Sequence, residues 1–193
     1  MTAADLRTKW NQRYAGPQRS PQPAFVLSEH QHLLPASGLA LDLACGLGGN
    51  ALALAAHGLD THAWDISDQA LMHLQRFAED RQLHITTLER DCETQPPEPD
   101  RFDIIVVSHF LHRPSAAALA AALRLGGLLF YQTWSHAKVS DNGPANPDFR
   151  LADNELPTLF PDLRIRVYRE EANLGDTTRG FRDQALLVAQ RTI

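Results

Sequence analysis

This sequence has little cysteine, no long apolar run and no excess of positive charge, and each of these features excludes a class of protein. The 193 residues include only two cysteines, too few for a disulfide framework or a cysteine-based zinc site. The formal net charge of -5 does not suit sequence-independent nucleic-acid binding. No apolar run reaches the ~20 residues of a membrane-spanning helix, and no signal-like segment opens the chain. We therefore expect a cytoplasmic protein without nucleic-acid or membrane partners.

The histidines do not suggest a metal centre. The nine histidines are scattered, and neither His30 with His32 nor His109 with His112 has a cysteine or acidic residue at a metal-site spacing. We therefore expect no metal ion. Hydrophobic residues make up 44% of the chain and charged residues 21%, which is typical of a globular protein that buries its own core.

The hydrophobic pattern predicts strands that alternate with helices, the arrangement typical of a parallel sheet covered on both faces. The segment between the last two expected strands is too short for a covering helix, so the last strand should be antiparallel. We expect a doubly wound, Rossmann-like α/β fold with a mostly parallel seven-stranded sheet. The expected strands are 38–45, 60–65, 83–89, 102–110, 126–134, 163–170 and 183–191, and the expected helices are 1–14, 50–58, 67–81, 114–124 and 152–160.

Two segments lie outside this alternation, although residues 1–193 should form a single domain. Residues 1–25 combine a first helix, in which Leu6, Trp10 and Tyr14 share one face, with a proline-broken loop. We interpret them as a cap, with Trp10 as core packing. Residues 136–150 form a long irregular insertion of the kind that is usually functional.

The stretch LDLACGLGGNALALAAHGLD, residues 41–60, has the pattern of a nucleotide-binding turn. A buried strand ends in closely spaced glycines, and a helix whose first turn can bind an anion follows. Gly46, Gly48 and Ala51 satisfy the dinucleotide fingerprint, yet S-adenosylmethionine can use the same helix end. The glycines alone leave both cofactors open.

Three acidic residues near the carboxyl ends of successive strands favour the second cofactor. Asp65 ends the second strand, where a carboxylate can accept hydrogen bonds from two ribose hydroxyl groups of either cofactor. Asp42 lies inside the first strand, where a buried charge is costly unless it is paired, and a ligand ammonium group is one such partner. Asp91 follows the third strand and can accept from an adenine amino group, or simply cap its own acidic loop.

The combination of motifs resembles the class I S-adenosylmethionine-dependent methyltransferases. LDLACGLGGN resembles their first motif, RFDIIVVS their fourth-strand segment, and LRLGGLLFYQT the glycine turn before their fifth strand. KWNQRY and NPDFRLADNEL further resemble the small methyltransferases grouped with the tellurite-resistance and thiopurine enzymes. The sequence departs from the tellurite-resistance enzymes near the last hairpin, where Arg179 and Arg182 stand without the His-Arg pair of that group.

The resemblance implies S-adenosyl-L-methionine as the cofactor and assigns residues to its parts. The methionine end would lie against the glycine turn, with Arg13 reaching its carboxylate from the first helix. Ribose and adenine would meet the ends of the second and third strands, and Ser108 would close the pocket from the fourth. The implied cofactor-binding residues are Arg13, Asp42, Ala44, Gly46, Gly48, Asn50, Asp65, Ile66, Asp91, Cys92 and Ser108.

The expected reaction is methyl transfer to a small-molecule acceptor by a monomer or homodimer. His109, just past the fourth strand, is the candidate general base, should the acceptor carry a proton that must leave. His112 is a weaker candidate, and Trp134, His136 and Phe149 could form an acceptor lid. Two alternatives stay open: an NAD-dependent oxidoreductase, and a non-catalytic subunit that binds the cofactor and a partner.

Overall fold

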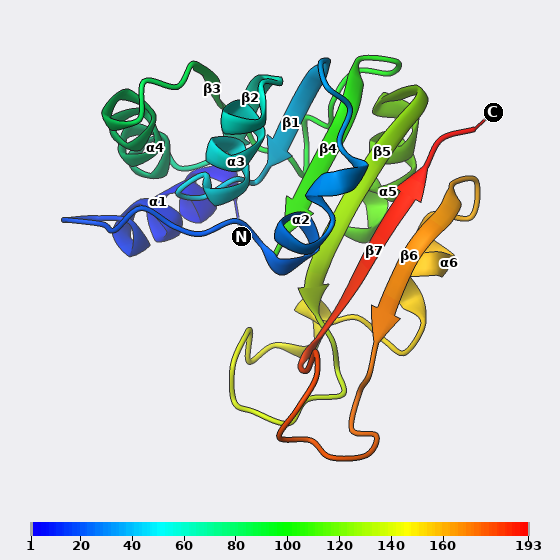
Figure 1. Cartoon of the computed structure of the whole chain (residues 1–193). Helices are drawn as coiled ribbons and strands as arrows, with labels where there is room; N and C mark the ends of the chain where they lie inside the picture. The colour runs from blue at the N-terminus through cyan, green and yellow to red at the C-terminus, as the bar shows by residue number, and fades with distance from the viewer. Residues whose placement is uncertain (1, 193) are drawn as a thin grey trace.

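The computed structural model describes residues 2–192, and its centre is a seven-stranded sheet (Figure 1). The strand order is β3-β2-β1-β4-β5-β7-β6, with parallel pairing from β3 to β5 and antiparallel pairing on both sides of β7. The expected doubly wound α/β fold is therefore confirmed. The strands are β1 (Leu39–Leu43), β2 (Asp60–Asp65), β3 (Ile85–Glu89), β4 (Phe102–Ser108), β5 (Leu123–Trp134), β6 (Arg164–Glu170) and β7 (Gln184–Gln190).

Helices cover both faces of this sheet, as the alternating pattern predicts. On one face α2, α3 and α4 pack on the sheet, and α5 and α6 pack on the other. The α-helices are α1 (Ala3–Arg13), α2 (Phe25–Glu29), α3 (Gly49–His57), α4 (Asp68–Asp80), α5 (Ala116–Ala122) and α6 (Glu155–Leu159). Short 3-10 helices span Gln31–Leu33, Arg113–Ser115 and Pro147–Phe149. No helix within residues 2–192 combines the length and apolarity that crossing a membrane requires.

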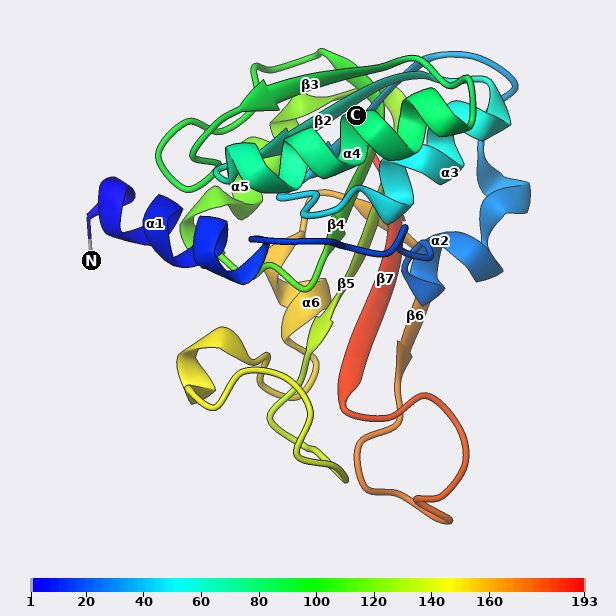
Figure 2. The same cartoon turned by 90° about the vertical axis from the view of Figure 1, so that its left-hand side faces the viewer.

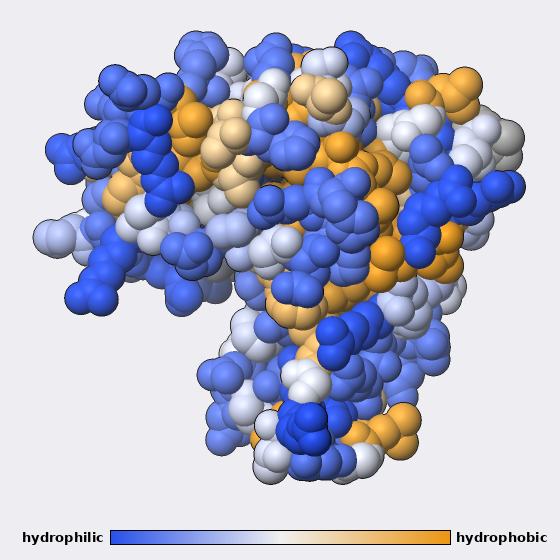
Figure 3. Space-filling view, in the orientation of Figure 1, coloured by the Kyte–Doolittle hydropathy of each residue, from blue (hydrophilic) through white to orange (hydrophobic). Residues whose placement is uncertain are grey.

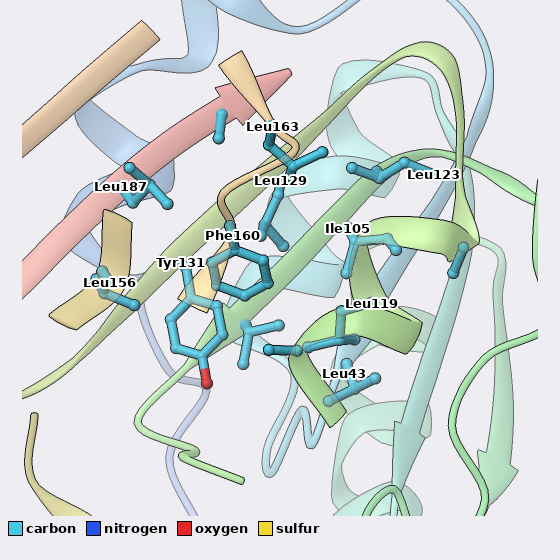
Figure 4. Packing of buried hydrophobic residues seen from close by; sticks show 14 of the residues in the cluster. Leu43, Ile105, Leu119, Leu123, Leu129, Tyr131, Leu156, Phe160, Leu163 and Leu187 are labelled. Carbon is cyan, nitrogen blue, oxygen red and sulfur yellow. The ribbon is translucent and has the colours of Figure 1, made fainter. Parts of the chain in front are cut away.

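The core follows from side-chain alternation along the central strands. In β4, Ile104 and Val106 join the cluster beneath α2 and α3, whereas Ile105 and Val107 join the cluster beneath α5 and α6. Figure 4 shows the second cluster, in which Phe160 lies beside Tyr131. Both faces of the strand are buried, so its sequence is a continuous apolar run.

The structure adds two details that the pattern did not indicate. Helix α2 follows the proline loop directly, where no helix was expected. Strand β7 lies between β5 and β6, so the antiparallel strand is second from the edge and β6 forms the edge itself.

The carboxyl ends of the parallel strands form the lower edge of the sheet in Figure 1. The insertion at 136–150 and the β6–β7 loop extend from this edge as a largely hydrophilic lobe (Figure 3). Helix α1 lies beside α4 and buries none of its residues (Figure 2). The Thr2 side chain caps α1 by accepting from the Asp5 amide.

Candidate cofactor and acceptor site

The glycine turn between β1 and α3 has the strained backbone that its sequence predicts. Gly46 and Gly48 have φ values of +53° and +76°, and Ala44, which is not glycine, also adopts +53°. A Cβ added to Gly48 would lie 2.3 Å from Leu74 Cδ1, and one added to Gly46 would lie 2.7 Å from the Tyr14 hydroxyl. The chain's own packing therefore requires these glycines, and Tyr14 brings the N-terminal cap onto the turn.

Asp65 holds this turn from the end of β2. Its carboxylate accepts hydrogen bonds from the Gly46 amide at 2.7 Å and the Ser67 amide at 2.8 Å. Asp65 is 7% exposed, and this burial raises the pKa of its carboxyl group. A carboxylate has about four acceptor positions, so capacity for ligand hydroxyl groups remains.

Asp42 is buried more deeply than a ligand-contacting residue would be. It has no exposed surface, and its carboxylate accepts from the Ala51 amide at 3.0 Å and Asn50 Nδ2 at 3.2 Å. Burial raises the pKa of Asp42 to about 7, against the lowering effect of these two hydrogen bonds. The structure therefore pairs Asp42 with the first turn of α3, and Asp42 positions the turn from beneath.

Asn50 connects three segments around that turn. Its Nδ2 donates to Asp42 and to Ser108 Oγ at 3.0 Å, and its Oδ1 accepts from the Ala24 amide at 2.8 Å. The network joins β1, the end of β4 and the N-terminal cap. Asn50 and Ser108, both predicted from the resemblance, thus lie side by side.

The three residues assigned to adenine, Asp91, Cys92 and Ile66, differ in their surroundings. Asp91 caps its own loop, accepting from the Glu93 amide at 3.0 Å and Thr94 Oγ1 at 2.9 Å. Cys92 is buried, and burial raises the pKa of its thiol to about 12. Ile66 is half-buried beside Asp65.

Arg13 lies at the exposed end of α1. Its guanidinium is 5.7 Å from the centre of the Trp10 ring, and that ring stacks on Tyr14 at 6.0 Å. Trp10 is half-buried within the cap, so its packing is against Tyr14 and Arg13 instead of the central core. The Ser67 hydroxyl donates to Asn11 Oδ1 at 2.7 Å and fixes the cap above the end of β2.

His109 lies immediately after β4 in a left-handed conformation, with φ of +55°. Its Nε2 is 3.1 Å from Gln184 Oε1, and its ring lies 5.2 Å from that of Trp134. Part of the residue is exposed, yet burial of the ring lowers the pKa of the imidazole below its usual value. His112 instead bonds Ser115 Oγ through Nδ1, 2.6 Å away.

Two glutamines beside His109 were not predicted. Gln132 in β5 pairs in register with Ser108, and Gln184 begins β7. A polar residue inside the apolar run LLFYQTW was the one sequence signal for Gln132. Both glutamines line a surface cavity of about 380 Å³ that is open to solvent. Its other lining residues are Phe25, Arg169, Gly180, Phe181 and Arg182.

The insertion packs over Trp134. A Cβ added to Gly143 would lie 2.5 Å from Trp134 Cδ2, so the insertion touches the indole that contacts His109. His136 bonds the Pro147 carbonyl through Nε2, and Phe149 is 47% exposed. Of the three expected lid residues, Trp134 is the one that reaches His109.

Comparison with known proteins gives a consistent picture. Residues 40–127 match the family model described as "Methyltransferase domain". The probable S-adenosyl-L-methionine-dependent methyltransferase TehB of Haemophilus influenzae is 29% identical over 145 residues, which cover 70% of this chain and 49% of that protein. The ubiquinone biosynthesis O-methyltransferase of Coxiella burnetii is 35% identical over 98 residues, covering 48% and 42%. The chain thus spans about half the length of the curated relatives it matches.

Solved structures share the whole fold. The crystal structure of TehB from Haemophilus influenzae has a TM-score of 0.70 at 21% identity, covering 96% of this chain and 66% of that one. The geranyl diphosphate C-methyltransferase of Streptomyces coelicolor, solved with Mg²⁺, geranyl diphosphate and S-adenosyl-L-homocysteine, has a TM-score of 0.69 at 14% identity, covering 98% of each chain. At these identities the likeness concerns the fold.

Proposed function

We propose that this chain, a class I S-adenosylmethionine-dependent methyltransferase by its fold and by the sequence of residues 40–127, transfers a methyl group to a small-molecule acceptor. One observation carries the proposal. Buried acids at the ends of two adjacent strands, Asp42 and Asp65, hold the glycine turn and the start of α3 at the carboxyl edge of the sheet. Ligands of doubly wound sheets bind at that edge.

The residues present fit an S-adenosyl-L-methionine cofactor. The Asp65 carboxylate would accept from the ribose hydroxyl groups, and Gly46, Gly48 and Asn50 would lie along the methionine end above Asp42. Arg13, Ala44 and Ser108 would complete that end, and Ile66, Asp91 and Cys92 would line the adenine end. When bound, the cofactor supplies an electrophilic methyl group on a sulfonium.

The chain's own residues would orient the reactants and exclude water. The cap lies on the glycine turn through Tyr14, and the insertion lies on Trp134, so the edge is covered from two sides. Such positioning is the main contribution a protein makes to a displacement between two bound molecules. His109, beside the cavity at Gln184, is the proposed proton acceptor.

A small molecule suits the cavity of about 380 Å³. The net charge of -5 also disfavours a nucleic-acid acceptor. We further propose a cytoplasmic protein that acts as a monomer or homodimer, and the free thiols of Cys45 and Cys92 suit a reducing compartment.

The test is calorimetric titration with S-adenosyl-L-homocysteine, with NAD as the comparator. We expect saturable binding of S-adenosyl-L-homocysteine, no binding of NAD, and a large loss of affinity in Asp65→Asn. Asp60→Asn, exposed at the other end of β2, is the matched control and should bind normally. Binding of NAD alone would favour the oxidoreductase alternative, and a stoichiometric protein partner without methyl uptake would favour the non-catalytic one.

The role of His109 has its own test. His109→Asn keeps a side chain that tolerates the left-handed conformation but removes the imidazole. We expect transfer of labelled methyl groups to a small-molecule extract to fall by about 100-fold or more, the scale of general-base catalysis, with cofactor affinity retained. Unchanged transfer would remove His109 from the mechanism.

A further inference from the structure

A chain of hydrogen bonds runs from a backbone amide to His109 across three neighbouring strands. The Val26 amide donates to Gln132 Oε1 at 2.7 Å. Gln132 Nε2 donates to Gln184 Oε1 at 2.7 Å, and the same oxygen lies 3.1 Å from His109 Nε2. Gln132 is 3% exposed, and both ends of its amide group have protein partners.

The direction of every bond in this chain follows from its first member. A backbone N–H can only donate, so the atom of Gln132 that faces Val26 must be its carbonyl oxygen. The amide nitrogen of Gln132 therefore faces Gln184 and donates, which requires an oxygen on Gln184. That oxygen is also the partner of His109 Nε2, so Nε2 must carry a hydrogen.

The hydrogen on Nε2 determines which ring nitrogen of neutral His109 has a free lone pair. In a neutral imidazole one nitrogen carries the proton and the other accepts, so Nδ1 is the acceptor. Within residues 2–192, the one hydrogen bond of the ring is made by Nε2, and Nδ1 has no protein partner. Contact with Trp134 restricts the ring orientation.

We propose that Gln132 and Gln184 are positioning residues that fix the tautomer of His109, so that its Nδ1 is the base that takes a proton from the methyl acceptor. The inference rests on the proposed function and narrows the substrate class. A base is needed only by an acceptor whose nucleophilic atom loses a proton, so the acceptor carries an O–H, N–H or S–H group.

The atoms balance in such a transfer. The acceptor heteroatom bonds to the methyl carbon and gives its proton to Nδ1, while the electron pair of the broken carbon–sulfur bond stays on sulfur. The imidazolium then releases the proton to water. The charged groups that line the cavity beside Gln184 are Arg169 and Arg182, and both pair with Glu171.

The direct test is nitrogen NMR of the full chain labelled with ¹⁵N-histidine, which distinguishes the two neutral tautomers. We expect His109 to be protonated on Nε2 and unprotonated on Nδ1 at neutral pH. Gln184→Met removes the accepting oxygen and should give a mixture of tautomers. Gln184→Glu keeps an acceptor in the same place, so it should restore the Nε2–H form and raise the pH midpoint of His109. A wild-type ring protonated on Nδ1 would overturn the inference, even if neither variant folds.

Activity supplies a second reading. An acceptor is first found by labelled methyl uptake. With that acceptor, Gln184→Met should lower kcat by about 10-fold or more and leave KM for the cofactor unchanged. Gln184→Glu should recover turnover, and the pH below which its activity falls should be higher than in the wild type. Equal turnover in Gln184→Met would overturn the positioning role. The two proposals fail separately: binding of S-adenosyl-L-homocysteine tests the methyltransferase, and the NMR tautomer tests the glutamine chain.

Discussion

At the scale of single residues, the site depends on polar groups that are almost fully buried. Asp42, Asn50 and Gln132 are each less than 5% exposed, and each is hydrogen-bonded by neighbours from other segments. Unpaired polar groups at that depth would cost several kcal/mol, so the pairing fixes their orientation. Orientation at this scale decides which atoms face the cofactor and the acceptor.

Asp42 should make stability depend on pH. Its pKa rises from 3.8 to about 7 on folding, so the folded chain holds this proton more tightly than the unfolded chain does. The resulting contribution to the free energy of unfolding is complete below pH 4 and is lost as the pH rises to about 7. Because one pKa unit corresponds to about 1.4 kcal/mol, this contribution amounts to a few kcal/mol. Urea unfolding between pH 4 and pH 8 should show this decline, and a smaller slope in Asp42→Asn. Equal slopes in the two proteins would mean that Asp42 ionises normally.

At the scale of elements, the insertion at 136–150 is organised around a buried arginine. Arg150 donates to the carbonyl oxygens of Ser135 at 2.9 Å, Asn142 at 2.6 Å and Pro144 at 2.8 Å. Asp183, immediately before β7, accepts from the amides of Val139 and Ser140. A segment without regular secondary structure is thus shaped by side chains that satisfy its backbone.

Replacing Arg150 should therefore loosen the insertion. Arg150→Lys keeps the charge but cannot reach three carbonyl groups in a fixed fork, so we expect a loss of about 2–4 kcal/mol. Hydrogen exchange should rise across 136–150, while binding of S-adenosyl-L-homocysteine at the other end of the edge persists. Lys138→Gln is the control, because its ion pair with Asp141 is exposed and contributes little. Similar exchange in both variants would contradict this role for Arg150.

At the scale of the whole molecule, the sheet and the N-terminal cap have different relations to the core. The sheet is held by three apolar clusters, whereas α1 buries no residue and meets the rest through polar contacts such as Asn11 with Ser67. Figure 2 shows α1 along one side of the molecule beside α4. Helix α1 can therefore lie beside the cofactor edge without supporting the fold.

A chain that begins at Ala15 should fold but bind the cofactor poorly. Without α1 the thermal midpoint should fall by only a few degrees, because little apolar area is lost. Affinity for S-adenosyl-L-homocysteine should drop by about 10-fold or more, since Tyr14 no longer lies on the turn. Arg7→Gln, which breaks an exposed ion pair with Glu89, should change neither quantity. Normal affinity in the truncated chain would show that the cap does not contact the cofactor.

The sequence by itself determined those features that depend on residues close to one another along the chain. Apolar periodicity, glycine turns and helix caps such as Ser67 act over a few residues, so strands, helices and the position of the cofactor turn could be predicted. The resemblance of consecutive motifs to a methyltransferase family allowed the identity of the cofactor to be predicted as well.

Only the tertiary structure decided what depends on residues far apart in the chain. Folding buries Asp42 completely beneath Asn50, and no local pattern encodes that depth. The order of β7 and β6 depends on pairing, which short-range periodicity does not specify. The tautomer of His109 follows from Val26, Gln132 and Gln184, which lie in different elements and meet only because the sheet brings β4, β5 and β7 together.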